Sequence, residues 1–142
     1  MSLECRACQA KCCRYFCFEI DTPETFNEFE DIRWYLLHEG ATVHIDDGCW
    51  FIAIANKCRN LGPDWRCTDY ENRPTICRTY EQDDCDATPG AYGYEQLFTT
   101  GEEIDAYARK TLGPSYERSK ARAHGLLAKK ARTGRRKVSR AN

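Results

Sequence analysis

Five cysteines fall within CRACQAKCCRYFC, residues 5–17, and they are the first side chains of the chain that could do chemistry. Cys5 and Cys8 have the C-x2-C spacing with which one short turn aims two sulfurs at a common centre, as in zinc ribbons and iron–sulfur loops. Cys12 and Cys13 are adjacent, so their side chains point apart and rarely bind one ion together. They can, however, serve two centres that lie close to each other. A second cysteine-rich stretch, residues 58–85, can supply the remaining ligands.

Ten cysteines in a chain of 142 residues indicate either a disulfide scaffold or a metal scaffold. The chain opens MSLECRACQAKCC, without the apolar run of a secretory signal, and no stretch approaches the roughly 18 apolar residues of a membrane helix. We therefore expect no membrane partner and a reducing, cytoplasmic location, where thiols stay free to bind metal. An enzyme with a redox-active or nucleophilic cysteine is the third alternative. It needs one or two activated thiols and usually a histidine, and nothing places any of the three histidines near a thiol.

Basic residues gather beside the thiols. Residues 1–113 contain eleven Lys and Arg, and seven of these adjoin a cysteine: Arg6, Lys11, Arg14, Lys57, Arg59, Arg66 and Arg78. A four-thiolate zinc site or an oxidised four-iron cluster carries a charge of about −2, which nearby cations offset. Reactive thiols would have the same neighbours, so the pattern supports ligation without deciding it.

A helix and a hairpin must position these thiols. Residues 23–39 are predicted as an amphipathic helix, with Pro23 at its first position and Asp21 or Thr22 as its cap. Its buried stripe consists of Phe26, Phe29, Ile32 and Leu36. Residues 42–55 are predicted as a β-hairpin, because Asp47-Gly48 favours a type I′ turn between two apolar arms. Residues 1–20 show little regular pattern, and the irregular stretch that reaches about residue 95 needs something such as a metal to fix it.

The C-terminal part is predicted to be helical. Thr100 and Glu103 form a capping box, Gly113-Pro114 ends that helix, and Ser115 caps a last helix through about residue 132. The fold class is therefore α+β: a small, irregular, metal-stabilised domain with a β-hairpin, three to four helices and much loop. We expect a metal-binding domain in residues 1–95, a helical extension in 96–132 and a basic, disordered tail in 133–142.

Charge is distributed unevenly along the chain. Residues 1–113 carry a net charge of −10, whereas residues 114–142 carry +9. The basic segment is suited to an acidic protein or a nucleic acid, although it has no aromatic residues beyond Tyr116 on which bases could stack. A solvated helix and tail that balance an acidic body would have the same composition.

At its two cysteine clusters the sequence resembles the YkgJ-like cysteine-cluster family, which is described as zinc- or iron-chelating. The family's signature is a C-x2-C-x2/3-C-C run followed by a segment of the form C-x2-L…C-x-[IV]-Y-x-x-R-P-x-x-C-R. Here the second part is CRNL at residues 58–61, CTDYENRPTICRTY at residues 67–80 and a final cysteine. The resemblance implies a metal site built from Cys5, Cys8, Cys12, Cys13, Cys58, Cys67, Cys77 and Cys85. Asp69 departs from the family's aliphatic residue, and Cys17 and Cys49 lie outside its pattern.

The implied cofactor is zinc or an iron–sulfur cluster, in one or two centres, because thiolates suit both. We expect a metal-chelating protein without catalytic turnover, in which the metal is part of the fold. One alternative is an iron–sulfur redox or methyl-transfer-related enzyme, because the cysteine cluster also looks like that of bacterial flagellin lysine-N-methylases. Another is a metal-stabilised nucleic-acid or protein interaction module that uses residues 115–142.

Overall fold

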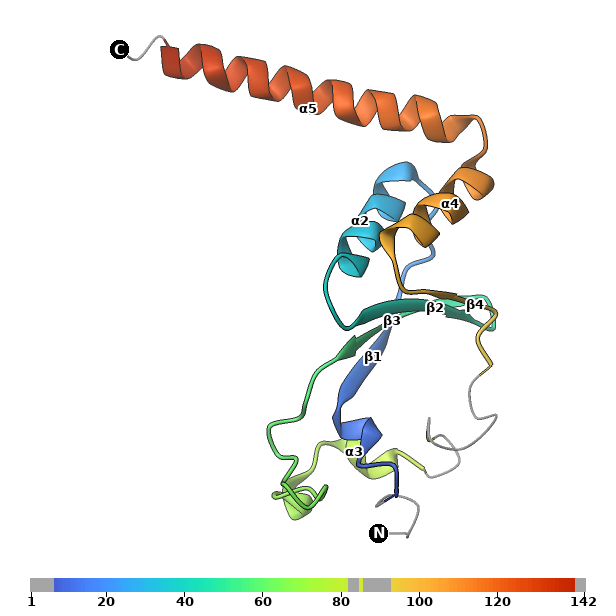
Figure 1. Cartoon of the computed structure of the whole chain (residues 1–142), viewed down its shortest axis with the longest axis vertical. Helices are drawn as coiled ribbons and strands as arrows, with labels where there is room; N and C mark the ends of the chain where they lie inside the picture. Colours follow the sequence, from blue (N-terminus) through green and yellow to red (C-terminus); the bar gives the residue numbers. More distant parts are fainter. Residues whose placement is uncertain (1–6, 82–84, 86–92, 140–142) are drawn as a thin grey trace. The chain divides into compact units, whose positions relative to one another are not determined.

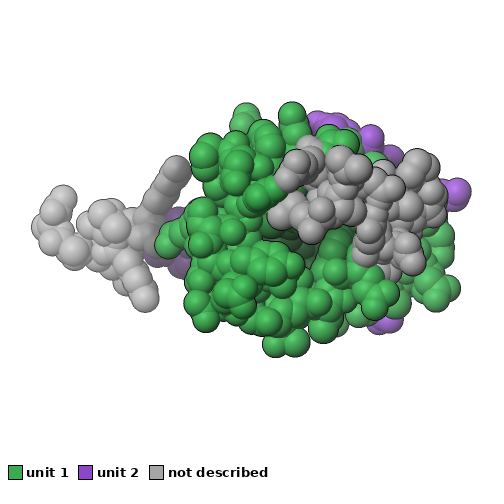
Figure 2. Space-filling model, turned by 90° about the horizontal axis from the view of Figure 1, so that it is seen from below, with its two compact units in different colours: residues 1–21, 38–99 green, residues 22–37, 100–142 purple. Residues whose placement is uncertain are grey.

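A computed structural model describes residues 7–81, 85 and 93–139, and it shows an α+β protein with a four-stranded sheet, several helices and long loops (Figure 1). Packing divides the chain into two units, residues 1–21 with 38–99 and residues 22–37 with 100–142 (Figure 2). Residues 22–37 thus pack with the C-terminal segment rather than with the cysteine-rich one. The functional division near residue 95 stays a prediction.

The first unit contains an antiparallel sheet in the order β1-β3-β2-β4. Its strands are β1 (Tyr15–Ile20), β2 (Ala41–Asp46), β3 (Cys49–Ala55) and β4 (Gln96–Phe98). The predicted hairpin is confirmed as β2 and β3, and both residues of its turn, Asp47 (φ 47°) and Gly48 (φ 75°), have the positive φ that a type I′ turn requires.

One face of this sheet carries the buried apolar residues of the unit. Val43 pairs with Ile52 on β3 and with Phe98 on β4, so these three side chains share a face. Val43 and Phe98 are fully buried, and the Phe98 ring stacks on Trp50 with 5.6 Å between ring centroids. The face gives the hairpin a fixed register, because a shift of one residue would expose every one of these side chains.

Strand β1 was not expected in residues 1–20. The prediction of an irregular segment there is wrong for residues 15–20, which pair with β3 from Tyr15↔Ala55 to Ile20↔Trp50. The strand YFCFEI is apolar on both faces for most of its length, so the alternation that identifies a strand in a sequence is absent.

The second unit contains three helices, α2 (Phe26–Leu36), α4 (Gly101–Leu112) and α5 (Ser115–Ser139). The predicted stripe on α2 is confirmed, since all four of its residues are buried. The start of α2 differs from the prediction: Thr25 is the cap, and it forms a capping box with Glu28. The capping box of Thr100 and Glu103 on α4 is present as predicted.

Helix α5 follows α4 after the two residues Gly113 and Pro114, and it is longer than predicted. Gly113 (φ 56°) donates its N–H to the Arg109 carbonyl and closes α4. Ser115 is the first residue of α5, where its hydroxyl donates to the Leu112 carbonyl (2.7 Å) instead of capping the helix. The helix continues to Ser139, into the segment predicted to be a disordered tail (Figure 1). In the described part of the chain, no helix is long and apolar enough to cross a membrane.

Candidate metal centre

The β1–β3 ladder brings the first cysteine cluster to the second. Beyond the ends of the two strands, Asn56 donates its N–H to the Arg14 carbonyl (2.9 Å), and Cys58 donates its N–H to the Cys13 carbonyl (2.7 Å). These bonds continue the antiparallel pairing to two residues that are 45 positions apart in the sequence. Strand pairing therefore places Cys13 next to Cys58.

A tight turn precedes β1 and carries Cys12 and Cys13. Gln9 (φ 55°) and Ala10 (φ 51°) are both in the left-handed region, and the 3-10 helix η1 (Lys11–Cys13) follows them directly. Two left-handed residues other than glycine in succession are uncommon and costly, which is the kind of strain found at ligand-holding turns. The Arg14 guanidinium donates to the Cys8 carbonyl (3.3 Å) and so ties the segment before the turn to its end.

The chain after Cys58 folds back on itself and places Cys67. Leu61, which is buried, pairs with Cys67 across an isolated bridge, and Thr68 donates its N–H to the Asn60 carbonyl (2.7 Å). Gly62 lies in this loop with little space around it. A Cβ on Gly62 would lie 2.9 Å from Asp64 Oδ1 and 3.2 Å from a backbone carbonyl oxygen, so a larger residue would require these neighbours to shift.

Two arginines hold Cys77 in place. Cys77 lies on the short helix α3 (Thr75–Thr79), which follows the 3-10 helix η2 (Tyr70–Asn72). Arg78 donates from Nε to the Arg73 carbonyl (3.0 Å) and from its terminal nitrogen to the Glu71 carbonyl, which binds the helix to the preceding turn. Arg73 donates to the Tyr70 carbonyl (2.8 Å), and its guanidinium lies 3.5 Å from the centre of the Tyr70 ring. Contacts within the segment itself therefore hold the short helix that carries Cys77.

The thiols of Cys12, Cys58 and Cys77 lie near enough to Cys13 to affect its ionisation. Burial, then the negative charge of Cys12 and a hydrogen bond to it, and then the charges of Cys58 and Cys77 together raise the pKa of the Cys13 thiol to about 12. The elements that carry these residues lie at one end of β1 (Figure 1). Sulfur donors from these segments suit a thiophilic metal ion or an iron–sulfur cluster, which binds them as thiolates and offsets their mutual repulsion.

The eight predicted ligands stand as follows. Cys12, Cys58 and Cys77 lie near enough to Cys13 to raise its pKa, whereas Cys8, Cys67 and Cys85 are half-buried and outside any disulfide, and Cys5 lies outside the described residues. Within residues 7–81, 85 and 93–139, no three Cys, His, Asp or Glu side chains are already arranged to hold one ion. The full set of eight ligands therefore stays a prediction.

The two cysteines left out of the predicted site lie on the sheet. Cys17 is on β1 and Cys49 is on β3, and both are exposed and outside any disulfide. Glu19, followed by Asp47 and Asp46, raises the pKa of Cys49 by its negative charge, so the environment of Cys49 disfavours a thiolate. This acidic setting differs from that of Cys12, Cys13, Cys58, Cys67 and Cys77, each of which has Lys or Arg as a sequence neighbour.

Sequence reasoning missed one contact that joins the two clusters. The Arg14 guanidinium lies 5.7 Å from the centre of the Trp65 ring, which links the turn at η1 to the loop after Cys58. Trp65 has φ 63°, a left-handed conformation that no short motif in the sequence predicts. Arg14 adjoins Cys13 in the sequence, and that adjacency was the only available signal.

An antiparallel sheet that joins two cysteine-bearing loops, with basic residues beside the thiols, defines a cysteine-cluster metal-binding protein. The CxxCxxCC family, described as a "Putative zinc- or iron-chelating domain", matches residues 4–107, and the chain belongs to this family. The family membership inferred from the cysteine motifs is thereby confirmed. Neither the search of curated proteins nor the search of solved structures found a match.

Proposed function

We propose that the protein is a small metal-chelating protein that holds zinc or an iron–sulfur cluster through cysteine thiolates, without catalytic turnover. The observation that carries this proposal is the convergence of Cys12, Cys58 and Cys77 on Cys13, from three segments that are distant in the sequence. The remaining cysteines of the family motif, Cys5, Cys8, Cys67 and Cys85, are the further ligands, in one centre or two.

The chemistry of the donors supports this proposal. Thiolates prefer soft or borderline metals, and the segments around them contribute no histidine. A zinc ion bound by four thiolates has no open coordination position, so such a centre would stabilise the fold rather than catalyse a reaction. Clustered arginines and lysines offset the negative charge of the bound centre.

A reducing cytoplasm is the compartment that suits such a protein. None of the nine described cysteines forms a disulfide, which leaves them available as metal ligands. An oxidising compartment would convert neighbouring thiols such as Cys12, Cys13 and Cys58 into disulfides and abolish metal binding.

The test compares two cysteine-to-serine variants of the full chain. Cys13→Ser removes a thiol at the centre of the cluster, whereas Cys49→Ser removes an exposed thiol on the sheet. Elemental analysis of protein purified without oxygen and without added metal should show that Cys13→Ser loses metal and that Cys49→Ser keeps the wild-type amount. Full metal content in Cys13→Ser, or equal loss in both variants, would contradict the proposal.

A further inference from the structure

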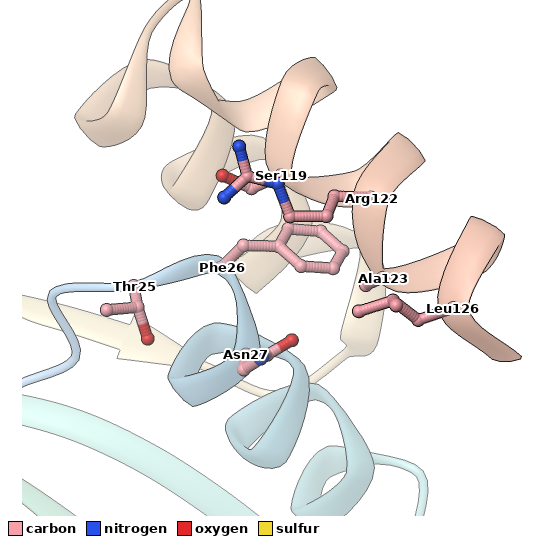
Figure 3. A pocket seen from close by; sticks show the side chains of 7 residues that line it. All are labelled: Thr25, Phe26, Asn27, Ser119, Arg122, Ala123 and Leu126. Carbon is pink, nitrogen blue, oxygen red and sulfur yellow. The ribbon is translucent and has the colours of Figure 1, made fainter.

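Only the first turns of helix α5 pack against the rest of its unit. Tyr116 is only 2% exposed and anchors the helix, with its ring 5.3 Å from the Phe26 ring in an edge-to-face contact. The last contacts with α2 surround a shallow hollow, which Ser119, Arg122, Ala123 and Leu126 line from α5 (Figure 3). From His124 to Thr133 every residue of α5 is exposed. The described part of the unit therefore does not cover residues 124–133 of α5.

Helix α5 is strongly basic. Residues 115–139 contain nine Lys and Arg and one acidic residue, Glu117, which is paired with Arg109 of α4. Lys129, Lys130 and Arg132 are exposed, and none of them forms an ion pair with another described residue. Their charges repel one another along the helix, so a polyanion that neutralises them would also stabilise the helix.

The composition of α5 distinguishes among the possible polyanionic partners. An acidic protein groove that receives a helix requires large apolar anchors at regular spacing, and α5 has only the neighbouring pair Leu126 and Leu127 at the start of its free part. A helix that lies in a membrane surface has Trp, Phe or Leu along one apolar face, and residues 117–139 contain no Trp or Phe and only the adjacent pair Leu126 and Leu127. Single-stranded nucleic acid also requires aromatic platforms on which bases stack.

We propose that α5 binds the phosphate backbone of duplex nucleic acid without sequence preference. The basic residues from Arg118 to Lys137 span about 29 Å of helix axis at 1.5 Å per residue. A DNA duplex presents roughly 17 phosphate charges over the same length, and its major groove admits a helix. The proposal does not depend on metal binding, because α5 belongs to the unit that lacks the cysteine loops.

The test titrates the metal-loaded full chain into a fluorescent 20-base-pair DNA duplex of mixed sequence, at several salt concentrations between 50 and 200 mM. We expect a dissociation constant of about 10⁻⁴ to 10⁻⁶ M near physiological salt and a steep fall in affinity as salt increases. The variant K129Q/K130Q/R132Q should lower the slope of log K against log salt by about 2.7, which is 0.9 for each lost phosphate contact. At 0.1 M salt this change corresponds to an affinity loss on the order of 10²-fold or more.

The matched control is K129R/K130R/R132K, which changes the same three side chains and keeps their charge. Glutamine, lysine and arginine have similar helix propensities, so neither variant should change the helix content measured by circular dichroism. We expect the control to bind as the wild type does, and both variants to keep the wild-type metal content. Metal loss with intact DNA binding would contradict only the proposed function.

Two other titrations distinguish the competing partners. Polyglutamate represents an acidic protein, and phosphatidylglycerol vesicles represent an anionic membrane. Duplex binding that exceeds both at the same salt supports the proposal. It is overturned by equal or tighter binding to either one, by the absence of duplex binding at 50 mM salt, or by a salt slope that is the same in K129Q/K130Q/R132Q and the wild type.

Discussion

Tyr116 is predicted to be the residue that holds α5 in place. Its buried ring contacts Phe26 of α2, and the Arg109 guanidinium lies 4.4 Å from its ring centre. Its hydroxyl donates a hydrogen bond to Asp105 Oδ1. The Tyr116→Ala variant removes the ring and leaves a cavity, at a cost of about 3–5 kcal/mol in the free energy of unfolding.

The Tyr116→Phe variant separates the hydrogen bond from the packing. Asp105 keeps an ion pair with Arg109 (3.5 Å) and about a third of its side chain is exposed, so the carboxylate is not left buried without a partner. The loss is therefore expected to be only about 1 kcal/mol. Tyr70→Phe, at a tyrosine that is half exposed, is the matched control and should have no measurable effect.

Urea denaturation followed by circular dichroism at 222 nm measures these differences, because the long helices α2, α4 and α5 dominate that signal. Tyr116→Ala should lower the midpoint by about 2 M and Tyr116→Phe by less than 1 M. Equal losses in the two variants would show that the hydrogen bond, and not the packed ring, anchors α5. An unchanged midpoint in Tyr116→Ala would refute the packing described for this helix.

The same residue predicts a dependence on pH. Burial, and then the hydrogen bond to Asp105, raise the pKa of Tyr116 from its ordinary value of 10 to about 12. The folded state thus favours the protonated phenol, so this contribution to stability is complete below pH 10 and is lost as the pH rises to about 12. Tyr116→Phe should lack this loss when its stability is measured over the same range.

Four further predictions concern the start of α2, the cysteine loop and the interior of α5. Thr25→Ala removes the cap of α2 and should cost about 1 kcal/mol in urea denaturation. Backbone hydrogen bonds lower the pKa of Glu28, so its contribution should be present above its ordinary pKa and disappear as the pH falls through the lowered one; a Glu28→Gln variant with the same acid dependence as the wild type would contradict this. Arg78→Lys cannot reach both carbonyls of the turn and should weaken metal binding by about 10-fold in a competition titration, whereas Arg59→Lys should not. Gly125→Ala, in a helix with open space around the new methyl group, should stabilise α5 by about 0.5–1 kcal/mol and raise the far-ultraviolet helix signal.

Local signals in the sequence predicted the parts of the fold that local physics determines. The stripe on α2, the turn at Asp47-Gly48 and the capping box at Thr100 each depend on residues within a few positions of one another. Pro23 indicated too early a start for α2, because the capping box at Thr25 sets the helix boundary two residues after that proline. The basic run after residue 132 resembled a disordered tail, although its arginine and lysine residues are good helix formers.

Such local signals do not predict the pairing of segments that are distant in the sequence. Strand β1 exists because β3 pairs with it, and its aromatic residues gave no alternation to reveal it. For the same reason the motif predicts which cysteines are ligands but not which of them are neighbours. The proximity of Cys13 to Cys58 results from the β1–β3 ladder, whereas the contacts of Arg78 fix Cys77 only to the turn that precedes α3.

The central claim, that the cysteine cluster holds a metal centre, is tested most directly by the metal and acid-labile sulfide content of the full chain. The protein should be purified without oxygen and without added metal, and its visible spectrum recorded. The account predicts either one or two zinc ions per chain in a colourless protein, or about four iron and four sulfide per cluster in a brown one. A folded protein without metal, in which a thiol reagent titrates all ten cysteines with no loss of structure, would contradict it.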